Sequence, residues 1–170
     1  SADRSTTMAR KIPAVATNLF SVTNTKNPTT ATEGTLKSSS VTISVAAADS
    51  DGDIYHMLPV FSSWSIKHIW VHNDAITSGT SYDIGLYTTA ATPAVVDVDA
   101  YASAVDMSSA RTSAPIDAAF EARNITAIAQ KVHQDGAVTT DPSAWYWLSL
   151  TANTVGSAQG DITTEVQYVE

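Results

Sequence analysis

Three groups of residues in this 170-residue chain have the side-chain types that bind metals or catalyse hydrolysis. The first group, Asp49, Asp51 and Asp53, has the spacing of the opening ligands of a calcium loop. An EF-hand would also need glycine and a bidentate glutamate at positions that are occupied here by Ile54 and Val60. We therefore interpret the cluster as an acidic turn, with a looser calcium site as the weaker alternative.

The other two groups are a pair of histidines and a pair of aspartates. His68 and His72 fall on one face of an expected strand, but their i,i+4 spacing places them about 13 Å apart, too far to share a metal. His68 is expected to pack with Trp70. Asp97 and Asp99 have the residue types of a glycosidase pair, but in their short acidic stretch simple solvation is expected. With no Gly-x-Ser-x-Gly, phosphate-loop or HExxH motif, we expect no enzyme activity, no cofactor and no metal.

Charge divides the chain into two parts. Residues 1–40 hold five basic and two acidic residues, a net charge of +3, whereas residues 41–170 hold four basic and fifteen acidic residues, a net charge of −11. The first part is rich in Ser and Thr and has a single aromatic residue, Phe20. Such a segment cannot bury enough apolar surface to fold alone. We predict an extended N-terminal arm at 1–40 and one folded domain at 41–170.

The arm is expected to bind a partner, with its basic residues providing charge complementarity and its apolar residues providing buried area. These residues are Arg4, Arg10, Lys11, Ile12, Val15, Leu19 and Phe20. The acidic domain argues against direct binding to nucleic acid. No apolar run suggests a membrane span, and no secretory signal opens the chain, so we expect a product of the cytoplasm in which it is made.

The hydrophobic pattern of residues 41–170 has a period of two, which is typical of strands. We predict strands at 41–45, 54–61, 64–72, 81–88, 94–98, 116–121, 144–152 and 161–169, a short helix at 125–133 and a long connection at 99–114. In the strand at 64–72, the residues Trp64, Ile66, His68, Trp70 and His72 are expected to share one face, and the strand to lie centrally between two layers. About eight strands with long crossovers favour an antiparallel β-sandwich of the jelly-roll type.

The strand at 144–152 carries consecutive aromatic residues. Trp145 and Trp147 are expected on one face and Tyr146 on the other. The outer aromatic face must then be covered by the long 99–136 connection, by the arm or by another subunit. We include Trp145 and Trp147 among the partner-binding residues.

Three segments resemble small structural proteins of tailed bacteriophages. The longest is residues 73–87, Asn-Asp-Ala-Ile-Thr-Ser-Gly-Thr-Ser-Tyr-Asp-Ile-Gly-Leu-Tyr, and residues 105–111 and 150–154 are similar to later segments of the same group. Over residues 55–169 the chain resembles the capsid cement proteins of Bordetella-type short-tailed phages, and the arm has no match. Within the longest segment we expect Tyr82, Ile84 and Leu86 in the core, with Gly85 allowing close backbone approach.

The resemblance implies a jelly roll that lies on the outside of a phage capsid and holds neighbouring major capsid subunits together, with no catalytic residues. The implied partners are the major capsid protein and other copies of this chain, as a homodimer or homotrimer, with no direct contact to nucleic acid or membrane. The implied location is the capsid exterior of the virion, after synthesis in the bacterial host cytoplasm. Two alternatives stay open. One is a carbohydrate- or receptor-binding β-sandwich of a tail fibre, with Trp145 or Trp64 as a platform, and the other is a jelly-roll enzyme.

Overall fold

The computed structural model describes residues 34–47, 49–76, 80–155 and 158–170. The chain divides into two units, Ser1–Gly34 and Thr35–Glu170, and nearly all described residues belong to the second. The first strand begins at Leu36 and not at Val41, where the apolar alternation starts. Polar contacts hold its early part: Ser38 donates to Glu165 at 2.8 Å, and Lys37 pairs with Glu170. A hydroxyl-rich strand of this kind has no hydrophobic signal, which is why the sequence pattern missed its beginning.

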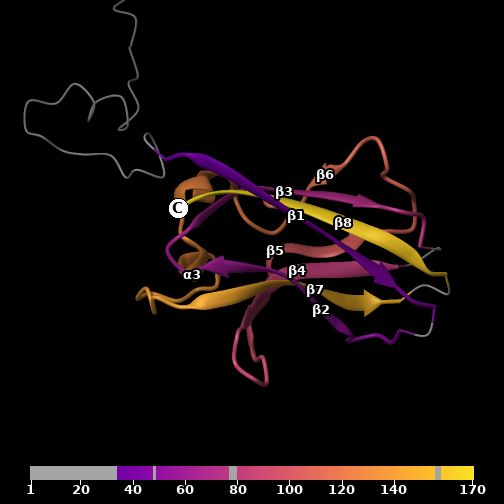
Figure 1. Cartoon of the computed structure of the whole chain (residues 1–170), viewed down its shortest axis with the longest axis horizontal. Helices are drawn as coiled ribbons and strands as arrows, with labels where there is room; N and C mark the ends of the chain where they lie inside the picture. Colours follow the sequence, from indigo (N-terminus) through magenta and orange to yellow (C-terminus); the bar gives the residue numbers. More distant parts are fainter. Residues whose placement is uncertain (1–33, 48, 77–79, 156–157) are drawn as a thin grey trace, which may run out of the picture. The chain divides into compact units, whose positions relative to one another are not determined.

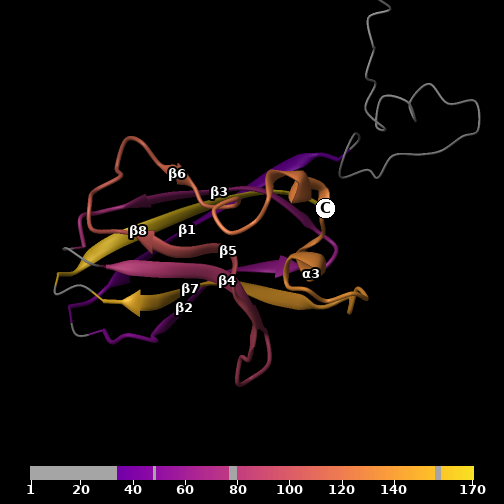
Figure 2. The same ribbon diagram turned by 180° about the vertical axis from the view of Figure 1, so that it is seen from behind.

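Among the described residues, eight strands form two antiparallel four-stranded sheets, which lie one above the other in Figures 1 and 2. The first sheet has the order β1-β8-β3-β6 and consists of β1 (Leu36–Val45), β8 (Gly160–Val169), β3 (Ser65–Asn73) and β6 (Ile116–Asp117). The second has the order β2-β7-β4-β5 and consists of β2 (Ile54–Phe61), β7 (Trp145–Thr154), β4 (Ser81–Thr88) and β5 (Val95–Asp106). The predicted all-β antiparallel sandwich is therefore confirmed.

The hydrophobic core lies between the two sheets. Tyr82, Ile84 and Leu86 of β4 are fully buried in it, as the sequence predicts. Burial of each aliphatic side chain stabilises the fold by about 1.5–3 kcal/mol. Gly85 lies against the backbone of β5, where an added Cβ would be only 2.2 Å from the carbonyl oxygen of Asp97. The predicted close backbone approach at Gly85 is confirmed.

The predicted common face of residues 64–72 is wrong. The register between β3 and β8 shifts between Ile66 and His68. This β-bulge leaves Ile66 in the core, while His68, Trp70 and His72 lie on the outer face and are only partly buried. Trp64 precedes the strand altogether. A bulge inserts one residue into the alternation, so a period-two reading cannot continue through it.

The middle of the chain also differs from the prediction. β5 continues to Asp106, through much of the segment 99–114 that was expected to be a connection. Its pairing with β4 has three register shifts, and Ala104 has a φ of 52°. Because the residues are small and the bulges interrupt the alternation of apolar and polar positions, the sequence does not predict this part of the strand. The predicted helix at 125–133 is divided into η1 (Ile125–Ala129), a 3₁₀ helix, and α3 (Val132–Asp135), which ends at Gly136. The strand predicted at 116–121 shortens to β6, two residues long.

Candidate interaction surface

The outer face of β7 carries the two tryptophans that the sequence singled out. Tyr146 and Leu148 point into the core and are 6% and 0% exposed, whereas Trp145 is 45% exposed and Trp147 is partly buried. The predicted alternation along this strand is confirmed. Trp145 is one of the few large apolar side chains among the described residues that keep close to half their surface in solvent. An exposed indole held on a strand is a typical anchor for a binding partner.

Trp145 belongs to a group of rings that we call the aromatic cluster, formed by Phe61, Trp64, Trp145 and Tyr168. Trp145 meets Phe61 and Trp64 edge to face, with ring centroids 5.1 and 5.3 Å apart. Trp64 in turn stacks on Tyr168 at 4.4 Å. Each such pair adds about 0.5–1.5 kcal/mol beyond the buried area, so these contacts hold Trp145 in place. Residues from β2, β7, β8 and the β2–β3 turn thus meet at one end of the sandwich.

A second row of rings continues along the same outer face. His56 stacks on Trp147 with centroids 5.7 Å apart and meets Tyr87 edge to face at 5.6 Å. A hydrogen bond of 2.8 Å joins His56 Nδ1 and the Ser149 hydroxyl. Burial lowers the pKa of His56, so the ring is neutral near pH 7. His56 and Trp147, which are partly buried, therefore add uncharged aromatic surface next to Trp145, while Tyr87 beneath them is buried.

Of the three covers expected for this face, the connection at 99–136 does not enclose Trp145. The connection that ends in α3 packs against the β2–β3 turn, where the Val132 amide donates to the Trp64 carbonyl at 2.8 Å and the His133 amide donates to Ser62 at 3.1 Å. It leaves Trp145 exposed. The arm residues that the sequence predicts for partner binding, Arg4, Arg10, Lys11, Ile12, Val15, Leu19 and Phe20, lie outside the described residues. Of the predicted set, the structure thus locates Trp145 and Trp147.

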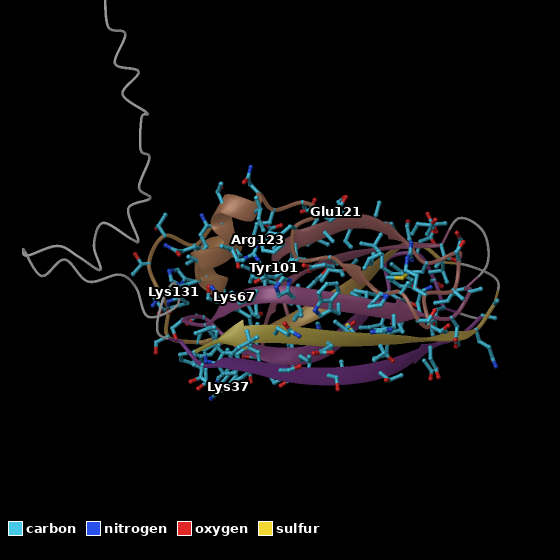
Figure 3. All side chains as sticks on the ribbon, turned by 90° about the horizontal axis from the view of Figure 1, so that it is seen from above. Lys37, Lys67, Tyr101, Glu121, Arg123 and Lys131 are labelled. Atoms are coloured by element: carbon cyan, nitrogen blue, oxygen red, sulfur yellow. The ribbon has the colours of Figure 1, made fainter. Side chains whose placement is uncertain are left out.

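A buried ion pair supports this connection, and sequence reasoning missed it. Arg123 and Asp135 lie 2.8 Å apart with side chains that are 5% and 0% exposed. Arg123 also donates to the carbonyls of Ile66 and Ala119, at 2.9 and 3.2 Å, and Tyr101 donates to Asp135 at 3.0 Å. Figure 3 shows Arg123 and Tyr101 side by side. Burial raises the pKa of Asp135 and Arg123 opposes that shift. The pair joins the segment before η1 and the end of α3 to β3 and β5.

The candidate calcium ligands have protein partners instead. Asp49 accepts hydrogen bonds from the Tyr55 hydroxyl at 2.5 Å and the Ala46 amide at 2.6 Å. Asp53 and Asp51 accept from the amides of Ser50 and Val155, at 2.7 and 2.8 Å. These bonds close the acidic turn that the sequence predicts. Within the part of the chain that the structure describes, no group of three or more His, Cys, Asp or Glu side chains is arranged to hold a metal ion.

The remaining candidate groups have packing or surface roles. His68 bonds Asp117 at 2.7 Å and stacks on Trp70 with centroids 5.4 Å apart, as expected of a packing residue. Asp97 and Asp99 line one side of a cavity of 340 Å³, where burial and the neighbouring Asp99 raise the pKa of Asp97. No helix in the described ranges is long and apolar enough to cross a membrane.

Comparison with solved structures finds this fold in two phage capsids. A chain of the capsid asymmetric unit of cyanophage Pam1 is similar with a TM-score of 0.55 and 13% sequence identity, over 80% of this chain and 85% of that chain. A chain of the capsid of Ralstonia phage GP4 is similar with a TM-score of 0.56 and 11% identity, over 81% of this chain and 85% of that chain. No protein-family model matches the sequence, and no curated protein matches it. At these identities the likeness establishes the fold alone.

Proposed function

We propose that this chain is a structural virion protein of a bacteriophage, which binds the outside of the capsid shell and cements neighbouring major capsid subunits. One observation carries the proposal: the sandwich shares its fold, over four-fifths of its length, with chains of two phage capsid structures. The strand order of the two sheets is consistent with a jelly roll, the type that the sequence resemblance implies.

The surface chemistry supports a role in contact rather than in catalysis. Charged residues are only 15% of the chain, so few ions lose water when two surfaces meet. Trp145 and Trp147 provide an aromatic anchor beside this sparsely charged surface. We infer that the basic and apolar residues of the arm that precedes β1 add a second contact, to the major capsid protein or to another copy in a homodimer or homotrimer. No contact with nucleic acid or membrane is part of this proposal.

Cementing requires many weak contacts and no chemical step. A contact of a few kcal/mol per copy is enough to stabilise a shell, because the symmetric shell repeats the contact many times. Linked contacts rarely dissociate at the same moment, so the shell stays intact. We therefore propose that the protein is not an enzyme and needs no cofactor. Its place would be the capsid exterior, after synthesis in the bacterial host cytoplasm.

Mass spectrometry of purified particles of the encoding phage tests this function. The proposal expects a copy number comparable to that of the major capsid protein, together with exposure to protease or antibody on intact particles. Absence from the particles would refute it. So would a few copies located only on the tail.

A second function is favoured by one observation, the half-exposed Trp145 supported by the edge of Trp64. Such a ring can serve as a platform for a sugar, as in a carbohydrate- or receptor-binding sandwich of a tail fibre. Two results would favour this alternative over the capsid role. The protein would bind host-surface glycans and lose that binding in Trp145→Ala, and it would be located on the tail.

A further inference from the structure

Four strands lie at sheet edges, each with one side unpaired among the described residues. Three of them carry features that hinder the addition of another strand. β6 is only two residues long, and β2 contains Pro59 and a register shift after His56. β5 has three register shifts and a positive φ at Ala104. Short strands, prolines and bulges are the usual means by which proteins protect exposed edges.

β1 has none of these protections. Its ten residues pair with β8 without a register shift, they include no proline, and Lys37 is the only charged residue. Figure 3 shows Lys37 near the end of this strand at the margin of the molecule. A long, regular edge of this kind presents alternate backbone N–H and C=O groups to the outside.

The side chains of β1 suit an added strand as well. Val41 and Ile43 point toward the core but are only partly buried, because β1 has a neighbour on one side only. Ser40 and Thr42 point outward and are exposed. A further strand beside β1 would cover the apolar pair and meet a strand whose outward side chains are mostly hydroxyls, with Lys37 as its only charged residue.

Charge indicates what kind of segment would bind. The strand next to β1 carries Asp161 and Glu165 on its outer face, and the chain ends at Glu170 beside Lys37. Residues 35–170, which form the sandwich, hold five basic and fifteen acidic residues, a net charge of −10, so a second copy would be repelled edge to edge. A neutral or basic extended segment meets no such repulsion.

We propose that the free edge of β1 accepts an extended, neutral or basic segment of another virion protein as an added β-strand. This inference rests on the proposed function, because it names the surface through which the protein would hold its shell partner. Backbone hydrogen bonds along β1 give the affinity. Contacts to Val41 and Ile43 fix the register.

Hydrogen exchange of the β1 amides tests the proposal with the unmodified full chain. In the free protein, alternate amides of residues 37–44 should exchange fast, since their N–H groups point away from β8. On purified particles the same amides should become protected. Unchanged exchange of these amides on particles that carry the protein would overturn the inference but not the proposed function. Absence of the protein from the particles would overturn both. Protection in the free protein that grows with its concentration would mean that copies pair with each other, and would also overturn the inference.

Proline substitutions provide an independent test. Neighbouring residues of a strand direct their N–H groups to opposite edges. Of the two variants Ser39→Pro and Ser40→Pro, one therefore removes an N–H group that points to the free edge of β1, and the other removes an N–H group that bonds to β8. Thermal unfolding identifies the outward variant, which keeps the wild-type Tm more closely. This variant should occupy particles at least tenfold more weakly than the wild type, while Ser39→Ala and Ser40→Ala, which keep both N–H groups, should bind like the wild type. Wild-type occupancy of the outward proline variant would contradict the proposal.

Discussion

Trp64 and Trp145 meet edge to face with ring centroids 5.3 Å apart, although one precedes β3 and the other begins β7. The inner ring, Trp64, stacks on Tyr168, and the outer ring is 45% exposed. Trp64 therefore contributes to the packing of the fold, whereas Trp145 is exposed on its surface. This division of roles is the basis of the first prediction.

Replacement of Trp145 by alanine should weaken binding to shells and leave the domain folded. The change removes two edge-to-face ring contacts and the buried half of the indole, so we expect a loss of about 2–3 kcal/mol in unfolding free energy. Occupancy on purified shells should fall at least tenfold, about 1.4 kcal/mol, because an aromatic anchor is lost. Co-sedimentation and thermal unfolding measure the two effects. Val95→Ala, at a residue 58% exposed on β5, is the matched control, and equal occupancy of the two variants would contradict the assignment.

Replacement of Arg123 by methionine should destabilise the domain strongly. The change removes the counter-charge of Asp135 and the bonds to two backbone carbonyls, which leaves a buried carboxylate with the Tyr101 hydroxyl but no opposite charge. We expect a loss of about 3–5 kcal/mol by chemical denaturation. The double variant with Asp135→Leu should recover part of this loss. Arg111→Met, at a more exposed arginine, is the control, and a similar small effect of both single changes would show that the buried pair does not hold the connection.

Acid should release the contact between Asp141 and Ser62. The Ser62 hydroxyl donates to Asp141 at 2.5 Å and the Ser143 amide donates at 2.9 Å, and these bonds lower the pKa of Asp141 below its ordinary value of 3.8. The ionised carboxylate therefore contributes stability above about pH 4, which is lost as the pH falls through the lowered pKa. Asp141→Asn should reduce the Tm at pH 7, and the difference from the wild type should shrink as the pH falls below 3.8. A Tm difference that stays constant with pH would refute this linkage.

Deletion of residues 1–22 should leave a folded sandwich, because the first strand begins at Leu36. The truncated protein should bind shells at least tenfold more weakly, about 1.4 kcal/mol, since the basic and apolar residues of the arm would be gone. Circular dichroism measures the first expectation and shell occupancy at matched salt measures the second. Neutralisation of Arg4, Arg10 and Lys11 in the full-length chain distinguishes the contribution of charge to shell binding from the contribution of the apolar residues. Unchanged occupancy of the deletion variant would mean that the arm does not contribute.

The sequence could predict those parts of the fold where apolar residues alternate regularly. The strands at 54–61 and 81–88, the core positions Ile84 and Leu86 and the outward position of Trp145 are all confirmed. It could not predict features that depend on distant partners. The bulge beyond Ile66 breaks the alternation in β3 because of its pairing with β8.

The candidate site shows the same limit. Trp145 is visible in the sequence as part of an aromatic run, but its contact with Trp64 arises only when β7 reaches the β2–β3 turn. Arg123 and Asp135 have no spacing that signals a pair, because an irregular segment joins them and the burial of both is set by the two sheets. The open edge of β1 likewise appears only once the order of the strands in each sheet is known.

We propose that this protein stabilises a phage shell by contact alone. The most direct measurement is the rupture temperature of particles prepared with and without it, followed by release of the packaged DNA. We expect shells that lack the protein to assemble but to rupture at a lower temperature, and purified protein added back to restore the wild-type value. Equal rupture temperatures with and without the protein would contradict it.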